Sequence, residues 1–404
     1  GGNYHPSPGG RGWGRGRETS GGRIWKGRWK MAGIAIDVSP LAPPKTGIGH
    51  YVHNLLAHIR DIDRDDEFYL FSRSRFRLED RIAPAGNTFA RFYRIPRYPS
   101  PFLWYNLVLP LQVSRHRIDL LYSPTHYTSL VTDVPVVLTV YDLTPLLFPE
   151  AHRWDTRLMH KTYFRLSVKK AKVITTISES SKRDIVELLK VPEEKVRIVY
   201  PGVERRFAPI PDEDRLRRVA EKYGLPEKFI LFVGTLEPRK NLVTLIKAFA
   251  GLKKRGIPHR LVVVGKEGWL YAPVFQVLRD VGLQEEVLLT GYVDEDDLPA
   301  LYNLACVFVL PSLYEGFGLS LLEAMACGCC VVASDCSSIP EAVGDAALLF
   351  DPHSVQELEG CLLKILEDEG LRKELREKAV ERAGRFDWRR SAEEMLGIFG
   401  EVAG

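Results

Sequence analysis

The sequence predicts an α/β protein with two doubly wound domains, each a parallel sheet covered by helices on both faces. Short apolar strands alternate with amphipathic helices, which is typical of parallel sheets. This alternation is interrupted once and then restarts, and 404 residues are ample for two hydrophobic cores. We expect an extension outside the fold, two Rossmann-like domains that face each other across a cleft, and a last helix: residues 1–30, 31–203, 204–386 and 387–404.

The first predicted domain opens with an apolar strand directly after Met31. A proline-rich loop follows, and then a helix from residue 46 that carries apolar residues at helical spacing. Further helices are expected around residues 153–170 and 180–189. Residues 196–203 are interpreted as the connection between the domains, because two prolines follow them. The expected strands are 33–38, 67–71, 119–123, 136–141 and 172–178.

The second predicted domain repeats this alternation, and its clearest helix carries an apolar face from Leu242 to Leu252. The last helix, residues 387–402, begins with Trp388. Ligands of such sheets bind outside the carboxyl ends of the strands, so loops that follow strands are the candidate sites. The expected strands are 229–234, 261–265, 287–289, 307–310, 331–333 and 348–350.

Charge is concentrated at the start of the chain. Residues 1–30 contain ten glycines, three tryptophans and seven Lys/Arg against one acid, a composition that cannot bury a core and predicts disorder. With a net charge of +6 there and +4 overall, the rest of the chain sums to −2. The folded body is therefore nearly neutral, and no nucleic-acid partner is expected.

The cysteines and the hydropathy pattern indicate a cytoplasmic protein. All six cysteines lie beyond residue 305, and Cys327 and Cys330 form a C-x-x-C pattern. No second pair accompanies it, so small buried thiols in a reducing compartment are favoured over a metal or redox site. No secretory signal is visible, and no apolar stretch reaches the roughly 20 residues that span a bilayer.

The stretch from residue 311 to 335 is the strongest candidate site. A buried strand is followed by the loop Glu315-Gly316-Phe317-Gly318 and by a helix over residues 320–326. The N-terminus of a helix attracts anions, and glycines let a ligand approach the main chain closely. Glu315 and Glu323 bracket this loop with seven residues between them. An ordinary acidic first helical turn is the alternative, but the strand–loop–helix–strand context favours a ligand site.

This arrangement resembles the E-x7-E signature of retaining glycosyltransferases of the GT-B fold, specifically family four, also called group one. The resemblance covers residues 31–402 and is more specific in the second domain. It implies that Glu315 and the loop holding Gly316, Phe317, Gly318 and Leu319 bind the donor sugar. It also implies that Glu323 binds the nucleotide ribose and that the last helix returns to the first domain.

Residues 234–240 resemble the family's G-x-x-x-x-x-K segment, in which an arginine and a lysine hold the donor diphosphate. Arg239 and Lys240 are the corresponding residues, and two fixed cations would offset the charge that develops on the leaving group. A solvated helix N-terminus is the alternative. Cations there oppose the helix dipole, however, which favours a bound anion.

Two further strand ends should surround the nucleobase, but the base itself is not readable from them. The resemblance places Gly265 and Lys266 after one strand, and Tyr292 and Val293 after another. The acidic run at 294–297 looks like a metal cluster but leads into a helix, so we expect a helix cap and first turn. Since this family generally needs no metal, no metal site and no cofactor are expected.

The first domain offers weaker candidates. Gly47 and Gly49 would face the diphosphate across the cleft. Tyr141 stands where many relatives have a histidine directed at the transferred sugar, and a tyrosine can still donate a hydrogen bond. We therefore assign Tyr141 to the catalytic residues, although the histidine's role does not transfer to it. His126 either substitutes in part or is structural.

Residues 71–118 carry nine arginines against two acids, with aromatic residues interleaved. A basic, aromatic surface fits an anionic membrane face or a lipid-pyrophosphate acceptor, so peripheral binding at the inner face of the cell membrane is one expectation. A solvated helix with an ordinary buried stripe explains the pattern equally well.

The resemblance implies transfer of a hexose from a nucleotide-diphosphate sugar to a saccharide or lipid-linked saccharide, with retention at the anomeric carbon. Residues 36–41 and 139–146 look most like bacterial mannosyltransferases of surface-polysaccharide assembly, which favours GDP-mannose as donor. The alternatives are a soluble UDP-glucose-dependent synthase, a sugar-nucleotide epimerase and a non-catalytic sugar-binding subunit. The acceptor, the linkage and the oligomeric state stay open.

Overall fold

The computed structural model describes residues 32–42, 47–74, 87–92, 101–148, 154–266, 268 and 271–404. Met31–Gly404 form one compact unit by their contacts. The expected disorder of residues 1–30 lies outside the described residues. Within the described ranges, no helix combines the length and hydropathy needed to cross a membrane.

The first sheet has seven parallel strands in the order β3-β2-β1-β4-β5-β6-β7. The five predicted strands are confirmed, and β3 was not predicted. The interpretation of residues 196–203 as connection is wrong at its start, because Ile174 in β6 pairs with Val196 in β7. The strands are β1 Gly33–Asp37, β2 Glu67–Ser72, β3 Thr88–Phe92, β4 Leu120–Ser123, β5 Val136–Thr139, β6 Val173–Thr176 and β7 Val196–Ile198.

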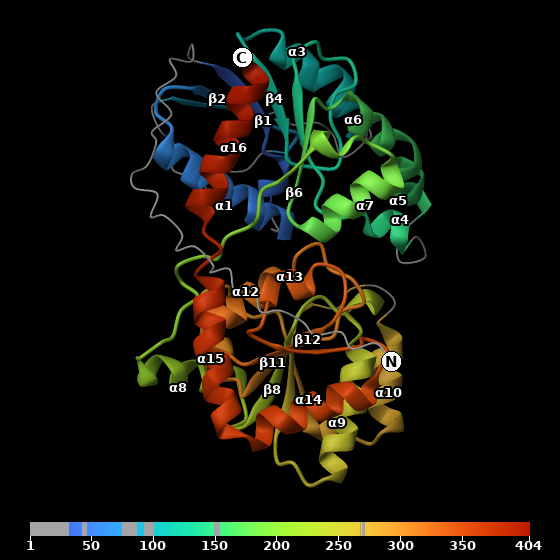
Figure 1. Ribbon diagram of the computed structural model, residues 1–404, viewed down its shortest axis with the longest axis vertical. Coiled ribbons are helices and arrows are strands. Elements are labelled where there is room, and N and C mark those ends of the chain that lie inside the picture. The colour runs from blue at the N-terminus through green and yellow to red at the C-terminus, as the bar shows by residue number, and fades with distance from the viewer. Residues whose placement is uncertain are drawn as a thin grey trace, which may run out of the picture. The chain divides into compact units, whose positions relative to one another are not determined.

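Helices cover both faces of the first sheet, because alternate residues of each buried strand point to opposite sides. Ile34 and Ile36 of β1 pack in one core with α1 and α16, whereas Ala35 packs in the other with η2, α3, η4 and α6. Figure 1 shows α1 beside α16, away from α3 and α6. The helices include α1 Gly47–Ile62, α2 Pro101–Leu103, η2 Trp104–Val108, α3 Leu109–Val113, α5 Trp154–Met159, η4 His160–Phe164, α6 Arg165–Lys170 and α7 Glu179–Leu189.

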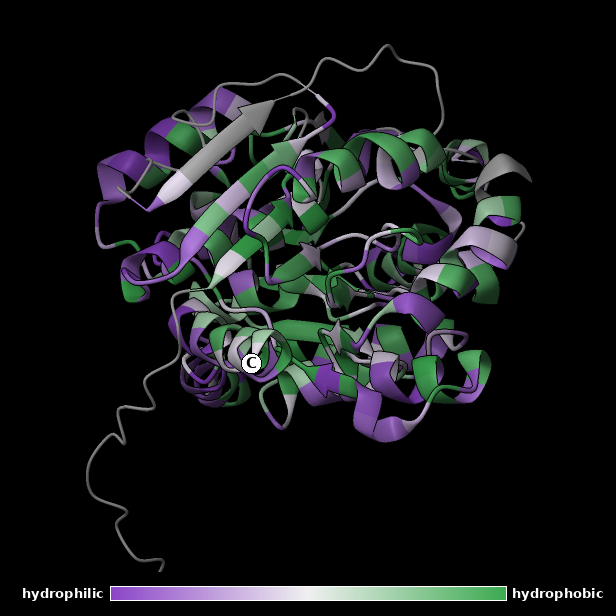
Figure 2. Cartoon of the chain, turned by 90° about the horizontal axis from the view of Figure 1, so that it is seen from above, coloured by the Kyte–Doolittle hydropathy of each residue, from purple (hydrophilic) through white to green (hydrophobic). Residues whose placement is uncertain are grey.

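The second sheet has six parallel strands in the order β10-β9-β8-β11-β12-β13, and all six were predicted. The central strand β11 is fully buried, because helices cover both faces of this sheet as well. Figure 2 shows the apolar residues concentrated on the strands and polar residues on the outer helices. The strands are β8 Phe229–Val233, β9 Arg260–Val264, β10 Val287–Gly291, β11 Val307–Leu310, β12 Val331–Ser334 and β13 Leu348–Phe350.

The helices of this second part include the predicted apolar helix, α9, whose buried face runs from Leu242 to Leu252. They are α8 Glu213–Tyr223, α9 Leu242–Lys254, α10 Ala272–Asp280, α11 Leu298–Leu304, α12 Leu319–Ala326, α13 Ile339–Val343, α14 Val355–Glu367 and α15 Glu369–Ala383, and the last helix of the chain is α16 Trp388–Ala403.

The last helix, α16, packs on the first domain, as the resemblance implied. The Trp388 ring lies edge-on to Tyr51 of α1 at 5.3 Å between centroids. Farther along, Phe399 contacts Tyr122 of β4 at 5.2 Å, and Lys172 Nζ donates to the Val402 carbonyl at 3.1 Å. The end of the chain is therefore part of the first domain's core.

Candidate active site

The loop between β11 and α12 has a backbone that requires glycine. Gly318 has φ +93° and directly precedes α12, and a Cβ there would lie 2.8 Å from Leu321. The left-handed region is costly for other residues, so the sequence enforces this sharp entry into the helix. Gly316 has a different constraint: its Cβ would lie 2.9 Å from the Tyr141 carbonyl oxygen of the first domain.

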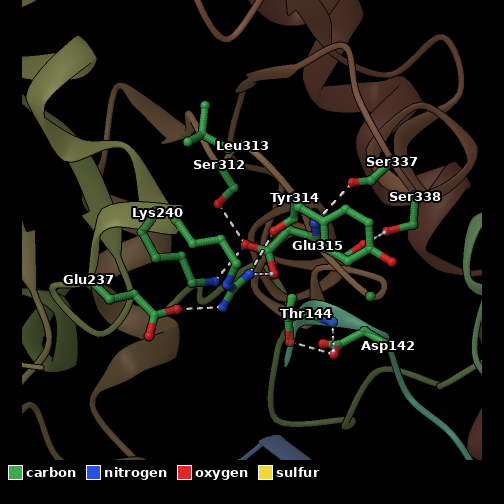
Figure 3. A network of polar contacts seen from close by, with 12 residues as sticks. Asp142, Thr144, Glu237, Lys240, Ser312, Leu313, Tyr314, Glu315, Ser337 and Ser338 are labelled. Carbon is green, nitrogen blue, oxygen red and sulfur yellow. Dashed lines mark hydrogen bonds and ion pairs between the residues drawn. The ribbon is translucent and has the colours of Figure 1, made fainter. Parts of the chain in front are cut away.

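Glu315 is a buried carboxylate, 6% exposed, at the centre of a polar network (Figure 3). Its Oε1 accepts from Lys240 Nζ and from Ser312 Oγ, both at 2.6 Å. Its Oε2 accepts from Arg239 at 3.0 Å. Burial by itself would raise the pKa of Glu315, but Lys240 and Arg239 lower it to about 2. The side chain is therefore ionised across the physiological range.

Arg239 and Lys240 lie in a short 3-10 turn, η6 Pro238–Lys240, one residue before α9 and not in its first turn as expected. Besides Glu315, Arg239 donates to the Tyr314 carbonyl and to Glu237 Oε1, each at 2.6 Å. Burial opposes its charge, but Glu315 and Glu237 raise the pKa of Arg239 above its ordinary value. The structure thus brings the predicted cations and the first glutamate together in one ionic cluster.

The backbone of the Glu315 loop is held by hydroxyl groups that no motif singled out. Ser337 Oγ accepts from the Glu315 N–H, and Ser338 Oγ donates to its carbonyl, both at 2.9 Å. These serines follow β12, and Ser312 follows β11. Because the strands are parallel, their carboxyl ends meet at one edge of the sheet. Only the fold places these serines beside Glu315.

Helix α7 of the first domain also contacts this loop. The Tyr314 hydroxyl donates to Asp184 Oδ2 at 2.5 Å, and Ser181 Oγ donates to the carbonyls of Tyr141 and Gly316 at 2.9 and 3.4 Å. Burial raises the pKa of both the Tyr314 phenol and the Asp184 carboxyl. The loop that holds Glu315 is therefore tied to the first domain through α7.

The N-terminus of α7 receives a carboxylate from the second domain. Glu341 of α13 accepts from the backbone N–H groups of Glu179 and Ser180 at 2.9 and 3.1 Å. The first N–H groups of a helix lack intrahelical partners, and the helix dipole favours an anion there. Glu341 thus caps a helix of the other domain, a contact that sequence motifs could not reveal.

Glu323 lies within α12. The Tyr302 hydroxyl donates to its Oε2 at 3.0 Å. Burial raises the pKa of Glu323 to about 7, although the Tyr302 hydrogen bond opposes this shift. A cavity of about 10 Å³ beside it is also lined by Leu319 and by His50 of α1. The two glutamates of the motif therefore have opposite pKa perturbations.

The predicted glycines of α1 lie near this second glutamate. Gly47 is the exposed first residue of α1, and Gly49 is buried. His50, the next residue, lines the Glu323 cavity and approaches Glu204 at 3.9 Å and Glu295 at 3.4 Å. The start of α1 is thereby placed close to the proposed ribose site.

Tyr141 is buried, 5% exposed, and its hydroxyl donates to the Pro124 carbonyl at 3.2 Å. Its ring packs edge-on against Tyr51 at 5.3 Å and His126 at 6.0 Å. Burial raises the pKa of the Tyr141 phenol well above its ordinary range. The main-chain carbonyl of Tyr141, not its hydroxyl, faces Gly316. Its role toward the sugar stays a prediction.

The loops proposed for the nucleobase follow β9 and β10. Gly265 has φ +146°, and a Cβ there would lie 1.9 Å from the Gly234 carbonyl oxygen, so these two strand ends approach closely. Lys266 is exposed, Tyr292 is 69% exposed and Val293 is buried. The Tyr292 ring is thus available to a planar ligand.

Phe317, in contrast, is 2% exposed and packs on Phe386 at 5.3 Å between centroids. Its side chain belongs to the core, so only its main chain could meet a donor. The expectation that the loop binds through its amides is compatible with this placement.

The acidic run before α11 does not cap that helix through its side chains, and this prediction is wrong. Asp297 occupies the N-cap position without a side-chain capping bond. Instead, Lys222 Nζ of α8 lies 2.6 Å from both Asp294 and Asp297. The Asp294 and Asp297 carboxylates form these salt bridges instead of capping bonds because α8 places the Lys222 ammonium beside them. Among the described residues, no group of three or more His, Cys, Asp or Glu could hold a metal ion.

The C-x-x-C pair is buried, as predicted. Cys327 and Cys330 are free thiols with 4% and 0% exposure. Burial raises the pKa of Cys327 to about 12, so its unreactive thiol form dominates.

Two doubly wound parallel domains, with a Glu-Arg-Lys cluster at strand ends of the second, have the architecture of the GT-B fold. Residues 212–382 match the family described as Glycosyl transferases group 1, and residues 45–207 match Glycosyltransferase Family 4. The chain belongs to this family of glycosyltransferases.

Curated relatives include two mannosyltransferases of Escherichia coli. O-antigen chain mannosyltransferase B is 29% identical over 378 residues, which is 91% of this chain and 99% of the relative. Serotype-specific mannosyltransferase WbdA is 33% identical over 282 residues, 67% of this chain. This chain spans about a third of the length of WbdA, since the match covers 34% of it.

Solved structures confirm the fold. Sucrose-phosphate synthase from Thermosynechococcus elongatus aligns with a TM-score of 0.72 and 22% identity, over 92% of this chain and 99% of that one. HepE from Anabaena in complex with UDP-glucose aligns with a TM-score of 0.72 and 20% identity, over 92% and 100%.

Proposed function

We propose that the protein is a retaining mannosyltransferase that uses GDP-mannose and needs no metal ion. The ionic cluster of Glu315, Arg239 and Lys240 carries this proposal, because it gathers two cations and a carboxylate at the strand ends where a nucleotide sugar would bind. The preference for mannose is supported by the two mannosyltransferases among the relatives. The acceptor is a hydroxyl of a saccharide or of a lipid-linked saccharide.

In this proposal, the donor diphosphate binds Arg239 and Lys240. Both cations are already fixed in place, so they can stabilise the charge of the departing nucleoside diphosphate without a metal ion. The acceptor hydroxyl attacks on the face from which the diphosphate leaves, and the departing phosphate takes the proton. The C–O bond to the acceptor forms as the sugar–phosphate bond breaks, with retention. No protein base is needed for this step.

The other site residues have binding roles in the proposal. Glu323 accepts hydrogen bonds from the ribose hydroxyls, and the start of α1 at Gly47 and Gly49 approaches the diphosphate. The exposed Tyr292 ring stacks on the base, with Gly265, Lys266 and Val293 around it. Tyr141 supports the sugar subsite, where its carbonyl already contacts the Gly316 region.

A UDP-glucose donor is the second candidate, because the similar HepE structure contains UDP-glucose. The stretch from Glu315 to Glu323 disfavours an epimerase, and the intact Arg239, Lys240, Glu315 and Glu323 disfavour a non-catalytic subunit. We also propose cytoplasmic activity. Contact of residues 71–118 with the inner membrane face stays a prediction, and residues 75–86 and 93–100 of that region lie outside the described residues.

A donor screen tests the proposal. Purified protein would be heated with GDP-mannose, UDP-glucose, GDP or UDP in excess EDTA, and slow donor hydrolysis would be followed by NMR, which also gives the anomeric configuration released. We expect GDP-mannose to raise the melting temperature most and the released sugar to keep its α configuration. A larger effect of UDP-glucose than of GDP-mannose would show that the proposed donor is wrong. Release of the β-sugar would overturn the proposed retention, and hydrolysis only after addition of Mg²⁺ would overturn the proposed metal independence. The Lys240→Ala variant should lose both signals.

A further inference from the structure

Large apolar side chains are exposed mainly on one part of the first domain. Of the eleven exposed large hydrophobic residues in the described ranges, seven lie within residues 101–113, 129–132 and 154–170. Single exposed apolar residues are normal, but clusters of them mark binding surfaces. We call the following seven, each 37–58% exposed, the apolar patch: Phe102, Leu103, Leu107, Leu111, Val131, Leu158 and Leu166.

The three segments that carry the apolar patch contact one another. Asn106 Nδ2 donates to the Tyr163 hydroxyl at 2.8 Å, and its Oδ1 accepts from the Leu130 N–H at 3.0 Å. The Phe102 ring lies 5.4 Å from the Tyr163 ring, and Lys170 Nζ donates to the Thr132 carbonyl at 2.6 Å. The segments therefore form one continuous surface on the side of the sheet away from α1 and α16 (Figure 1).

A row of cations runs along the same surface. Helices α5, η4 and α6 are continuous, and Arg157, Lys161, Arg165 and Lys169 are exposed on them at four-residue intervals, which places them on one side. No described residue forms an ion pair with any of the four. The sequence contains no acidic residue between Asp155 and Glu179. We call these four residues the basic row; Leu158 and Leu166 lie directly beside it.

We propose that the apolar patch and the basic row dock the protein on the surface of an anionic phospholipid bilayer. Apolar side chains enter the boundary between headgroups and acyl chains, while Lys and Arg are attracted to anionic headgroups. Nucleic acid would use the cations but leave seven exposed hydrophobic residues uncovered. The surface shares four apolar residues with the region expected at 71–118, namely Phe102, Leu103, Leu107 and Leu111, but its charge comes from residues 157–169. The docking does not depend on which sugar is transferred.

The test is sedimentation of the full chain with vesicles of phosphatidylcholine alone or mixed with phosphatidylglycerol. We expect binding to the mixed vesicles that weakens with salt. Lys161→Gln with Lys169→Gln should weaken it about 25-fold, at about fivefold for each cation near an anionic surface. Leu107→Ser with Leu111→Ser should weaken it by about tenfold or more through lost apolar insertion.

Matched controls use exposed residues of the same types elsewhere: Lys247→Gln with Lys373→Gln, and Leu188→Ser. They should bind vesicles as the unaltered protein does, and all variants should keep its melting temperature. Unchanged binding by both patch variants would overturn the proposal and assign the contact elsewhere, such as residues 1–30. Absence of vesicle binding, or a dimer that only the leucine variant disrupts, would overturn it in favour of another occupant.

Discussion

Replacement of Glu323 by Gln should remove a specific pH dependence of folding stability. Burial raises the pKa of this carboxyl from its ordinary value of 4.5 to about 7 in the folded protein. The folded pKa lies above the unfolded one. The contribution of the protonated carboxyl is therefore fully present below about pH 4.5, declines as the pH rises, and is lost above the folded pKa of about 7.

The magnitude follows from the two pKa values. The difference between 4.5 and about 7 corresponds to about 3 kcal/mol at about 1.4 kcal/mol for each pKa unit. Integration from about pH 5 to about pH 8 covers roughly 2.5 kcal/mol of this loss. A glutamine has no such titration, and its amide can still accept the Tyr302 hydrogen bond.

Urea unfolding of the ligand-free protein across this pH range measures the effect. The stability of the Glu323→Gln variant relative to the unaltered protein should rise by about 2.5 kcal/mol from about pH 5 to about pH 8. Other titrating groups, such as Asp66 with its pKa raised by burial to about 6, cancel in this difference. Glu377→Gln, at an exposed position on α15, is the matched control for a glutamate-to-glutamine change on a helix. A constant difference between Glu323→Gln and the unaltered protein would refute the reasoning.

Three further predictions concern the ionic cluster and its support. Lys240→Ala should lower kcat/KM for the donor by an amount that corresponds to about 2–4 kcal/mol of lost transition-state stabilisation, as for loss of one preorganised electrostatic group. A decrease in kcat/KM of less than about tenfold would argue against diphosphate binding at Lys240. Glu315→Gln should lower mainly kcat, because positive charge develops beside it, and a pure rise in KM would contradict this role. Tyr314→Phe and Asp184→Asn should each lower kcat, and the double variant should be no worse than the poorer single one if the Tyr314–Asp184 hydrogen bond positions the loop. Additive losses in kinetic measurements would separate their roles.

The second sheet could be predicted completely because its strands are short, continuous apolar runs. Strand β11 is fully buried and has no polar residue within it, so burial on both faces leaves a clear pattern. Strand β7 has three residues with an exposed Arg197 at its centre, and it follows an acidic turn. So short an edge strand shows no detectable alternation of apolar and polar residues, and only its pairing with β6 identifies it as a strand.

The candidate site likewise contains residues that could be predicted from the sequence and residues that could not. Glu315, Arg239 and Lys240 could be predicted because each belongs to a local motif at the end of a strand. Ser337 and Glu341 could not be predicted, because each contacts the backbone of a segment that is distant in sequence. Ser337 accepts from the Glu315 N–H, and Glu341 accepts from the first N–H groups of α7. The two pKa perturbations also depend on three-dimensional neighbours. Lys240 and Arg239 lower the pKa of Glu315, whereas burial raises the pKa of Glu323 more than the nearby His50 and Arg206 lower it.

In the ligand-free protein, the Glu315 carboxylate lies beside the two cations that would bind the donor diphosphate in the proposed reaction. Lys240 and Arg239 are paired with the Glu315 carboxylate, so no uncompensated buried cation awaits the donor. A buried unpaired charge would be strongly destabilising, and Glu315 removes that cost in the ligand-free protein. In the proposed reaction, a bound diphosphate would replace the Glu315 carboxylate beside the same two cations, and the carboxylate would stay near the sugar. Since the pKa of Glu315 is about 2, this exchange would involve no proton, and in the proposed reaction the returning carboxylate would assist release of the nucleoside diphosphate.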